Sequence, residues 1–122
     1  MNSIRPVILV EDDLLIRKGL SYFLESEGFI VKEAENGKQG LELIRESGGN
    51  CLVLLDLQMP VMTGEELLEA LSRDEDSTIR TVPVLVLTAR GNGFQHLGIM
   101  GTICKPFDLD QVLDKVKTLC GT

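Results

Sequence analysis

The fold follows from one short stretch near the start of the chain, Val7-Ile8-Leu9-Val10-Glu11-Asp12-Asp13. An uninterrupted apolar run of this length is typical of a β-strand that is buried on both faces, and the acids mark the point where the chain leaves the sheet. Strands of this kind belong to parallel sheets that helices cover on either side. The stretch therefore predicts an α/β protein whose first strand ends in a group of carboxylates.

Strands and helices alternate along the rest of the chain, and this favours a doubly wound, five-stranded parallel sheet. Apolar runs predict the strands, and helical spacing with N-cap and capping-box residues predicts the helices. The expected strands are 7–10, 29–34, 51–55, 82–87 and 101–104. The expected helices are 14–27, 36–47, one that begins at the capping box Thr63-x-x-Glu66 and fades into the polar stretch 72–81, and a last one capped by Asp108-x-x-Gln111.

Bulk composition narrows the class of protein. A length of 122 residues suits one domain, 1–122, and a formal net charge of −7 argues against direct binding to nucleic acid. No apolar stretch approaches the roughly 20 residues that cross a bilayer, and the first residues do not resemble a signal peptide, so we expect no membrane contact and a cytoplasmic location. Three cysteines and a single histidine make a zinc site or a disulfide framework improbable.

Polar residues that can bind a ligand or take part in a reaction follow four of the five expected strands. They are Glu11-Asp12-Asp13, Asp56, Thr88 and Lys105-Pro106. In a parallel sheet the carboxyl ends of the strands share one edge, and ligands bind there. Carboxylates that are held together repel one another and attract a hard divalent cation such as Mg²⁺. Beside such an ion, an aspartate can attack phosphorus, a lysine supplies a second positive charge, and a hydroxyl can bind a phosphoryl oxygen.

Four motifs, taken in order, resemble the signatures of response-regulator receiver domains of two-component signalling, which include the chemotaxis regulators. They are Val10-Glu11-Asp12, the run from Asp56 to Gly64 (Asp-Leu-Gln-Met-Pro-Val-Met-Thr-Gly), Thr88-Ala89 and Lys105-Pro106-Phe107. The resemblance covers essentially the whole chain. It implies the flavodoxin-like strand order 2-1-3-4-5.

The resemblance also implies a role for each acidic residue. Asp56 is the expected phosphoacceptor, and its carboxylate and that of Asp12 are the expected direct ligands of Mg²⁺. Glu11 is expected to act on the ion through water, and Gln58 to contribute its backbone carbonyl. The acidic pair of the family is the first two acids after the strand, so Asp13 is expected to cap the following helix or to have no part in the site.

Two further residues complete the expected site. Lys105 would bridge to the phosphate, and Thr88 would hydrogen-bond a phosphoryl oxygen and so sense its presence. The expected donor is a histidine kinase or a histidine phosphotransfer protein, and the expected target is another protein. Such a domain is a signalling switch and not an enzyme, apart from self-phosphorylation by small donors and a weak autophosphatase activity.

The sequence departs from the family pattern between Thr88 and Lys105. Thr102 stands where typical members have an aromatic residue or histidine that changes position on activation. The segment is also shorter than usual and carries three glycines within 90–98, so we expect a short or missing fourth helix. A threonine cannot supply the same large change in packing, so we expect the signal to leave through another element.

Two alternatives remain open. One is a degenerate receiver that acts as an interaction module without phosphorylation, although the carboxylates and Lys105 are all retained. The other is a haloacid-dehalogenase-like phosphatase, which needs a second aspartate where this chain has Gln58. The given sequence ends at Thr122, soon after the last expected helix, and we expect either a stand-alone regulator or a piece of a longer protein.

Overall fold

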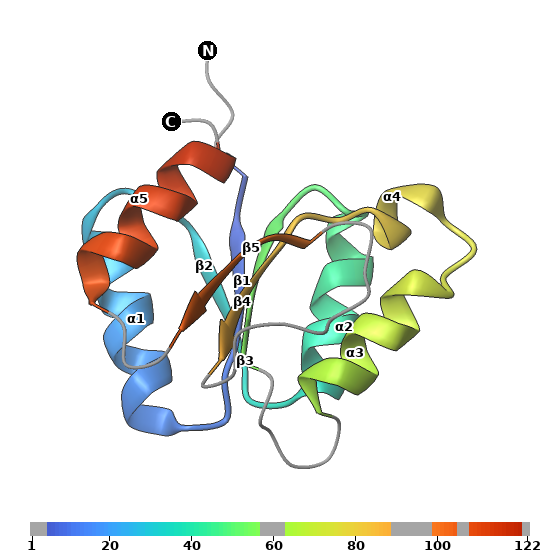
Figure 1. Ribbon diagram of the computed structural model, residues 1–122, viewed down its shortest axis with the longest axis horizontal. Helices are drawn as coiled ribbons and strands as arrows, with labels where there is room; N and C mark the ends of the chain where they lie inside the picture. Colours follow the sequence, from blue (N-terminus) through green and yellow to red (C-terminus); the bar gives the residue numbers. More distant parts are fainter. Residues whose placement is uncertain (1–4, 57–62, 89–98, 105–107, 121–122) are drawn as a thin grey trace.

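Five parallel strands form the centre of the molecule (Figure 1). The computed structural model describes residues 5–56, 63–88, 99–104 and 108–120. The strands pair in the order β2-β1-β3-β4-β5, which confirms the predicted fold class and strand order. Their bounds are β1 (Val7–Val10), β2 (Val31–Ala34), β3 (Leu52–Asp56), β4 (Val84–Thr88) and β5 (Ile99–Cys104).

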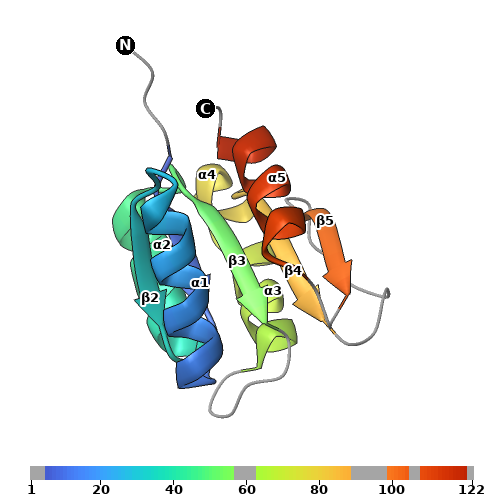
Figure 2. The same cartoon turned by 90° about the vertical axis from the view of Figure 1, so that its left-hand side faces the viewer.

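Helices cover both faces of the sheet (Figures 1 and 2). Helices α1 (Leu14–Ser26) and α5 (Leu109–Cys120) lie on one face. Helices α2 (Gly37–Ser47), α3 (Gly64–Ser72) and α4 (Ser77–Arg80) lie on the other. Within the described ranges, no helix has the length and apolar character that crossing a membrane requires.

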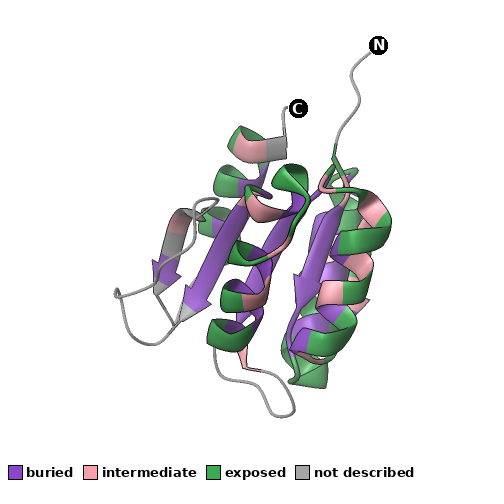
Figure 3. Cartoon of the chain, turned by 90° about the vertical axis from the view of Figure 1, so that its right-hand side faces the viewer, coloured by how far each residue is buried: buried purple, intermediate pink, exposed green. Residues whose placement is uncertain are grey.

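The core consists of two apolar layers, one on each face of the sheet, and the described side chains of the central strands β1, β3 and β4 are buried between them (Figure 3). Alternate residues of β1 point to opposite sides because side chains alternate along a strand. Ile8 and Val10 join the layer under α2 and α3, whereas Val7 and Leu9 join the layer under α1 and α5. Both faces of β1 are thus covered, as its uninterrupted apolar sequence predicts.

The predicted caps begin the helices as expected. The Asn36 side chain accepts a hydrogen bond from the backbone N–H of Gln39 at 2.9 Å. Thr63 and Glu66 form the reciprocal capping box, with side-chain to backbone distances of 3.1 and 2.9 Å. The same reciprocal pair forms between Asp108 and Gln111 before α5. Because each cap satisfies backbone N–H groups that have no partner within the helix, the helix starts could be placed from sequence.

The polar stretch 72–81 is more ordered than the sequence suggests, because it contains α4. Asp76 caps this helix, and the hydrogen bond that its carboxylate accepts from Thr78 holds the pKa of Asp76 below its usual value. Arg80 donates to the backbone carbonyls of Asp74 and Glu75 at 2.8 and 3.1 Å. Helix α4 is held by polar contacts and not by a periodic set of apolar residues, so the pattern of hydrophobic residues did not predict it.

Other bounds differ by small amounts. β2 begins at Val31 and not at position 29, and β5 begins at Ile99 and not at position 101. The family's fourth helix was expected between β4 and β5, and the prediction that it is short or missing falls on residues 89–98, outside the described residues. The label α4 in Figure 1 belongs to the earlier turn before β4.

Gly48 and Gly49 give a matched pair for a stability prediction. Both have positive φ, 67° and 86°, but a Cβ on Gly48 would meet nothing, whereas one on Gly49 would overlap the backbone carbonyl of Thr78. We expect Gly48→Ala to lower the free energy of unfolding by about 1 kcal/mol and Gly49→Ala by about 2 kcal/mol, since only the second adds a clash with α4 to the backbone strain. Urea unfolding of the two variants measures the difference, and equal midpoints would contradict this close approach.

Candidate functional site

Three carboxylates meet where β1 and β3 end. Val10 pairs with Leu55 in the parallel register. Glu11, which follows Val10, and Asp56, which follows Leu55, therefore lie at the same level on neighbouring strands. One carboxylate oxygen from each of Glu11, Asp12 and Asp56 lies within 4.8 Å of the others. The predicted acidic cluster is therefore present at the carboxyl edge of the sheet.

The cluster has a buried part and an exposed part. The side chains of Glu11 and Asp56 are 1% and 3% exposed, whereas Asp12 is exposed to solvent. Glu11 is also fixed by its backbone, because its N–H donates to the carbonyl of Ala34 in β2 at 3.0 Å. Its carboxylate Oε2 accepts from the N–H of Asp13 at 3.2 Å. Two of the negative charges are thus held below the surface, beside a third that faces solvent.

The donor set fits a hard divalent cation. Mg²⁺ binds oxygen ligands at about 2.0–2.1 Å in an octahedron, which separates two ligand oxygens by about 2.9 to 4.2 Å. The oxygens of the cluster lie within 4.8 Å of one another, which is close to that range. Bringing such charges together without a cation is unfavourable, because like charges repel strongly where water is excluded.

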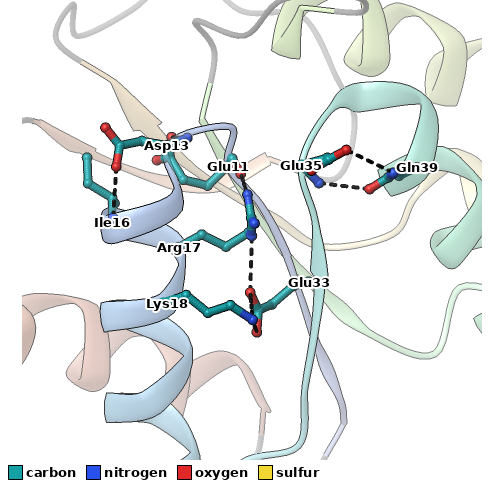
Figure 4. A network of polar contacts seen from close by, with 8 residues as sticks. All are labelled: Glu11, Asp13, Ile16, Arg17, Lys18, Glu33, Glu35 and Gln39. Carbon is teal, nitrogen blue, oxygen red and sulfur yellow. Dashed lines mark hydrogen bonds and ion pairs between the residues drawn. The ribbon is translucent and has the colours of Figure 1, made fainter.

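Asp13, the third acid of the opening stretch, has a different role. Its Oδ1 accepts a hydrogen bond from the backbone N–H of Ile16 at 3.0 Å, and its backbone conformation is extended, as at other N-caps (Figure 4). The prediction that Asp13 caps the first helix is confirmed.

Arg17 lies behind the acidic cluster and was not predicted from the sequence. Its Nη1 donates to the backbone carbonyl of Glu11 at 3.0 Å, and its Nε donates to Oε1 of Glu33 at 3.1 Å (Figure 4). Lys18 donates to the same Glu33 carboxylate at 3.2 Å. Burial by itself raises the pKa of Glu33, but the hydrogen bonds from Lys18, Ser21 and Arg17 outweigh it, so the pKa lies below its usual value.

One sequence signal could have identified Arg17. On the face of α1 that packs on the sheet, Arg17 precedes Leu20 and Leu24 by three and seven positions, where an apolar residue is expected. A charged residue at such a position needs a buried partner. In the described ranges the buried charged side chains are Glu11, Arg17 and Asp56, and all belong to this corner of the molecule.

The remaining predicted site residues are described less completely. Thr88 ends β4, the strand beside β3, where its backbone is in register with Cys104 of β5. The backbone of Thr88 lies at the predicted edge of the sheet, and its side chain is not among those described. Gln58 and Lys105 lie outside the described residues, and for Thr102 only the backbone is described, paired with Val86. The roles assigned to these four side chains remain predictions.

In comparison with known families, residues 7–117 match the model of the response regulator receiver domain. The chain is 36% identical over 118 residues to the transcriptional regulatory protein CpxR homolog of Haemophilus influenzae, covering 93% of this chain and 49% of that protein. It is also 36% identical to the transcriptional regulatory protein SrrA of Staphylococcus aureus, covering 93% of this chain and 46% of that protein. The chain therefore spans about half the length of these curated relatives.

Solved structures show the same architecture. The chemotaxis response regulator CheY4 of Vibrio cholerae superposes with a TM-score of 0.81 at 26% identity, covering 96% of this chain and 99% of that one. A CheY-like response regulator receiver domain protein from Methanospirillum hungatei gives a TM-score of 0.79 at 25% identity, covering 95% and 94%. Sequence and structure thus agree on the same group of proteins.

Proposed function

Because this chain belongs to the response regulator receiver domains, we propose that the carboxylate of Asp56 accepts a phosphoryl group from a phosphohistidine on a partner protein. Domains of this family act as switches in two-component signalling and not as enzymes in the ordinary sense. The observation that carries the proposal is the cluster at the strand ends, where carboxylate oxygens of Glu11, Asp12 and Asp56 lie within 4.8 Å of one another.

In this proposal Asp12 and Asp56 would hold Mg²⁺ directly, Glu11 would hold it by way of water, and Gln58 would contribute its backbone carbonyl. When bound, the ion would offset the repulsion between the attacking carboxylate and the phosphoryl oxygens. An oxygen of Asp56 forms the new bond to phosphorus. The bond from phosphorus to the donor's imidazole nitrogen breaks, and that nitrogen keeps the electron pair.

Two further residues would respond to the phosphoryl group. The ammonium of Lys105 is proposed to pair with a phosphoryl oxygen, and the hydroxyl of Thr88 to donate a hydrogen bond to another. Support for Thr88 comes from its backbone, which ends β4 directly beside the strand that carries Asp56. A change at Thr88 is proposed to alter the nearby surface, until water hydrolyses the acyl phosphate and resets the switch.

The proposed partners follow from the same chemistry. The donor is a histidine kinase or a histidine phosphotransfer protein, and we place the domain in the cytoplasm, where a kinase finds ATP. The proposed target of this domain is a protein and not nucleic acid, because a net charge of −7 repels a phosphate backbone. The transcriptional roles in the names of its relatives belong to those longer proteins.

A small phosphoryl donor tests the proposal directly. We expect incubation with acetyl phosphate and Mg²⁺ to add the mass of one phosphoryl group to most chains, and incubation with excess chelator to add almost none. Intact-mass spectrometry measures the adduct, and its removal by hydroxylamine identifies it as an acyl phosphate. Failure of the folded protein to form the adduct at saturating Mg²⁺ would favour an interaction module that works without phosphorylation.

A further inference from the structure

We propose that Arg17 is a positioning residue for the cation site, because it fixes the backbone from which Glu11 and Asp12 project. This inference rests on the proposed function, since it adds a residue to the same site. Arg17 does not belong to the acidic cluster and need not contact the ion or the phosphoryl group. Its role would be to hold the turn between β1 and α1 in the conformation that brings the carboxylates together.

The contacts of Arg17 join three elements. Its side chain reaches from α1 to the carbonyl of Glu11 at the end of β1 and to the carboxylate of Glu33 in β2, at 3.0 and 3.1 Å (Figure 4). A guanidinium is planar, and its N–H groups point in fixed directions, so two such bonds determine the relative placement of their acceptors. Arg17 is only 9% exposed, which limits the alternative positions open to its side chain.

The carbonyl that Arg17 holds is part of the peptide group between Glu11 and Asp12. Its orientation therefore sets the backbone angles on either side, ψ of Glu11 and φ of Asp12, and through them the direction of both side chains. The other groups at this turn are also held, because the N–H of Glu11 bonds to Ala34 and its carboxylate accepts from Asp13. Without Arg17 the Glu11 carbonyl would lose the hydrogen bond that fixes this peptide plane.

Charge and position predict opposite effects at this residue. A cation close to a cation site weakens Mg²⁺ binding by repulsion, and Lys18 adds a second positive charge that Glu33 offsets only in part. On charge alone, removal of Arg17 would tighten Mg²⁺ binding. If Arg17 acts by position, its removal loosens the turn and weakens binding. The sign of the change in affinity therefore separates the two explanations.

The test measures Mg²⁺ affinity by isothermal titration calorimetry on the whole chain. We expect the dissociation constant to rise about 10-fold in Arg17→Met, in the range seen when partners of metal ligands are removed. Arg17→Lys keeps the charge but has a single donor group in place of the fork, and should also weaken binding several-fold. Leu24→Ala is the control, since Leu24 is buried on the same helix away from the site, and affinity there should stay within about twofold.

Each outcome decides the matter. Unchanged or tighter Mg²⁺ binding in Arg17→Met, with normal binding in the unaltered chain, would overturn this inference and leave the proposed function intact. Absence of Mg²⁺ binding by the unaltered chain would overturn both. If Arg17→Met does not fold, Arg17→Lys decides, because an affinity equal to that of the unaltered chain would show that the fork geometry is not required. An equal loss of Mg²⁺ affinity in Leu24→Ala would show that general destabilisation explains the result for Arg17→Met, and would also overturn the inference.

Discussion

Asp56→Asn is expected to abolish the phosphoryl adduct, with a fall in its rate of formation of at least about 1000-fold, as is usual when a nucleophile is removed. Asparagine has nearly the same shape as aspartate, so the end of β3 should keep its structure. Its neutral amide, however, is a poor nucleophile toward phosphorus and a weaker ligand for Mg²⁺. Intact-mass spectrometry over time, with acetyl phosphate and Mg²⁺ in excess, measures the loss.

Asp13→Asn is the matched control for this substitution. It also replaces an aspartate by asparagine, at a position only two residues after Glu11. Asp13, however, caps α1, and asparagine serves equally well as an N-cap. Its adduct should therefore form at the rate of the unaltered chain. A hydroxylamine-sensitive adduct that forms at a normal rate on Asp56→Asn would assign the phosphoryl group to another carboxylate and contradict the proposed role of Asp56.

Much of this site could be predicted because its parts have local causes. The apolar run 7–10 and the run 51–55 mark strands that end in acids, and the reciprocal pair Thr63 and Glu66 marks the start of a helix. Each feature depends on neighbours in sequence. The adjacency of β1 and β3, which brings Glu11 beside Asp56, depends on strand order, and local patterns do not determine that order. It was predicted through the resemblance to the family.

The features that were missed depend on contacts between distant segments. Arg17 falls inside the predicted helix 14–27 without a role assigned to it, and its partner Glu33 lies sixteen positions away on another strand. Helix α4 is held by the bonds from Arg80 to carbonyls five and six residues earlier, and its single buried apolar residue, Ile79, gives no period. The position of Arg17 in the helix pattern signals a buried charge, but the partner of such a residue leaves no periodic trace and is found only in the three-dimensional structure.

The two neighbouring acids Asp12 and Asp13 should behave in opposite ways. We expect Asp12→Ala to weaken Mg²⁺ binding by at least about 100-fold, more than the loss of an outer-shell partner. An ion present at 100 times its dissociation constant stabilises the unaltered chain by about 2.7 kcal/mol, and after a 100-fold loss of affinity the same concentration gives about 0.4 kcal/mol. Urea unfolding with and without Mg²⁺ measures both values. Since Asp12→Ala also removes one of the carboxylates that repel one another in the acidic cluster, stability without Mg²⁺ should stay the same or rise.

Asp13→Ala should give the reverse pattern. Loss of the cap that holds the N–H of Ile16 is expected to lower stability by about 1 kcal/mol at any Mg²⁺ concentration. The increment from Mg²⁺ should remain, because the bond from Asp13 to the Glu11 carboxylate uses the backbone N–H, which alanine keeps. If Asp12→Ala and Asp13→Ala lost the stabilisation by Mg²⁺ equally, the ion would depend on Asp13 as well as on Asp12. The assignment of Asp13 as a helix cap and not a ligand would then be wrong.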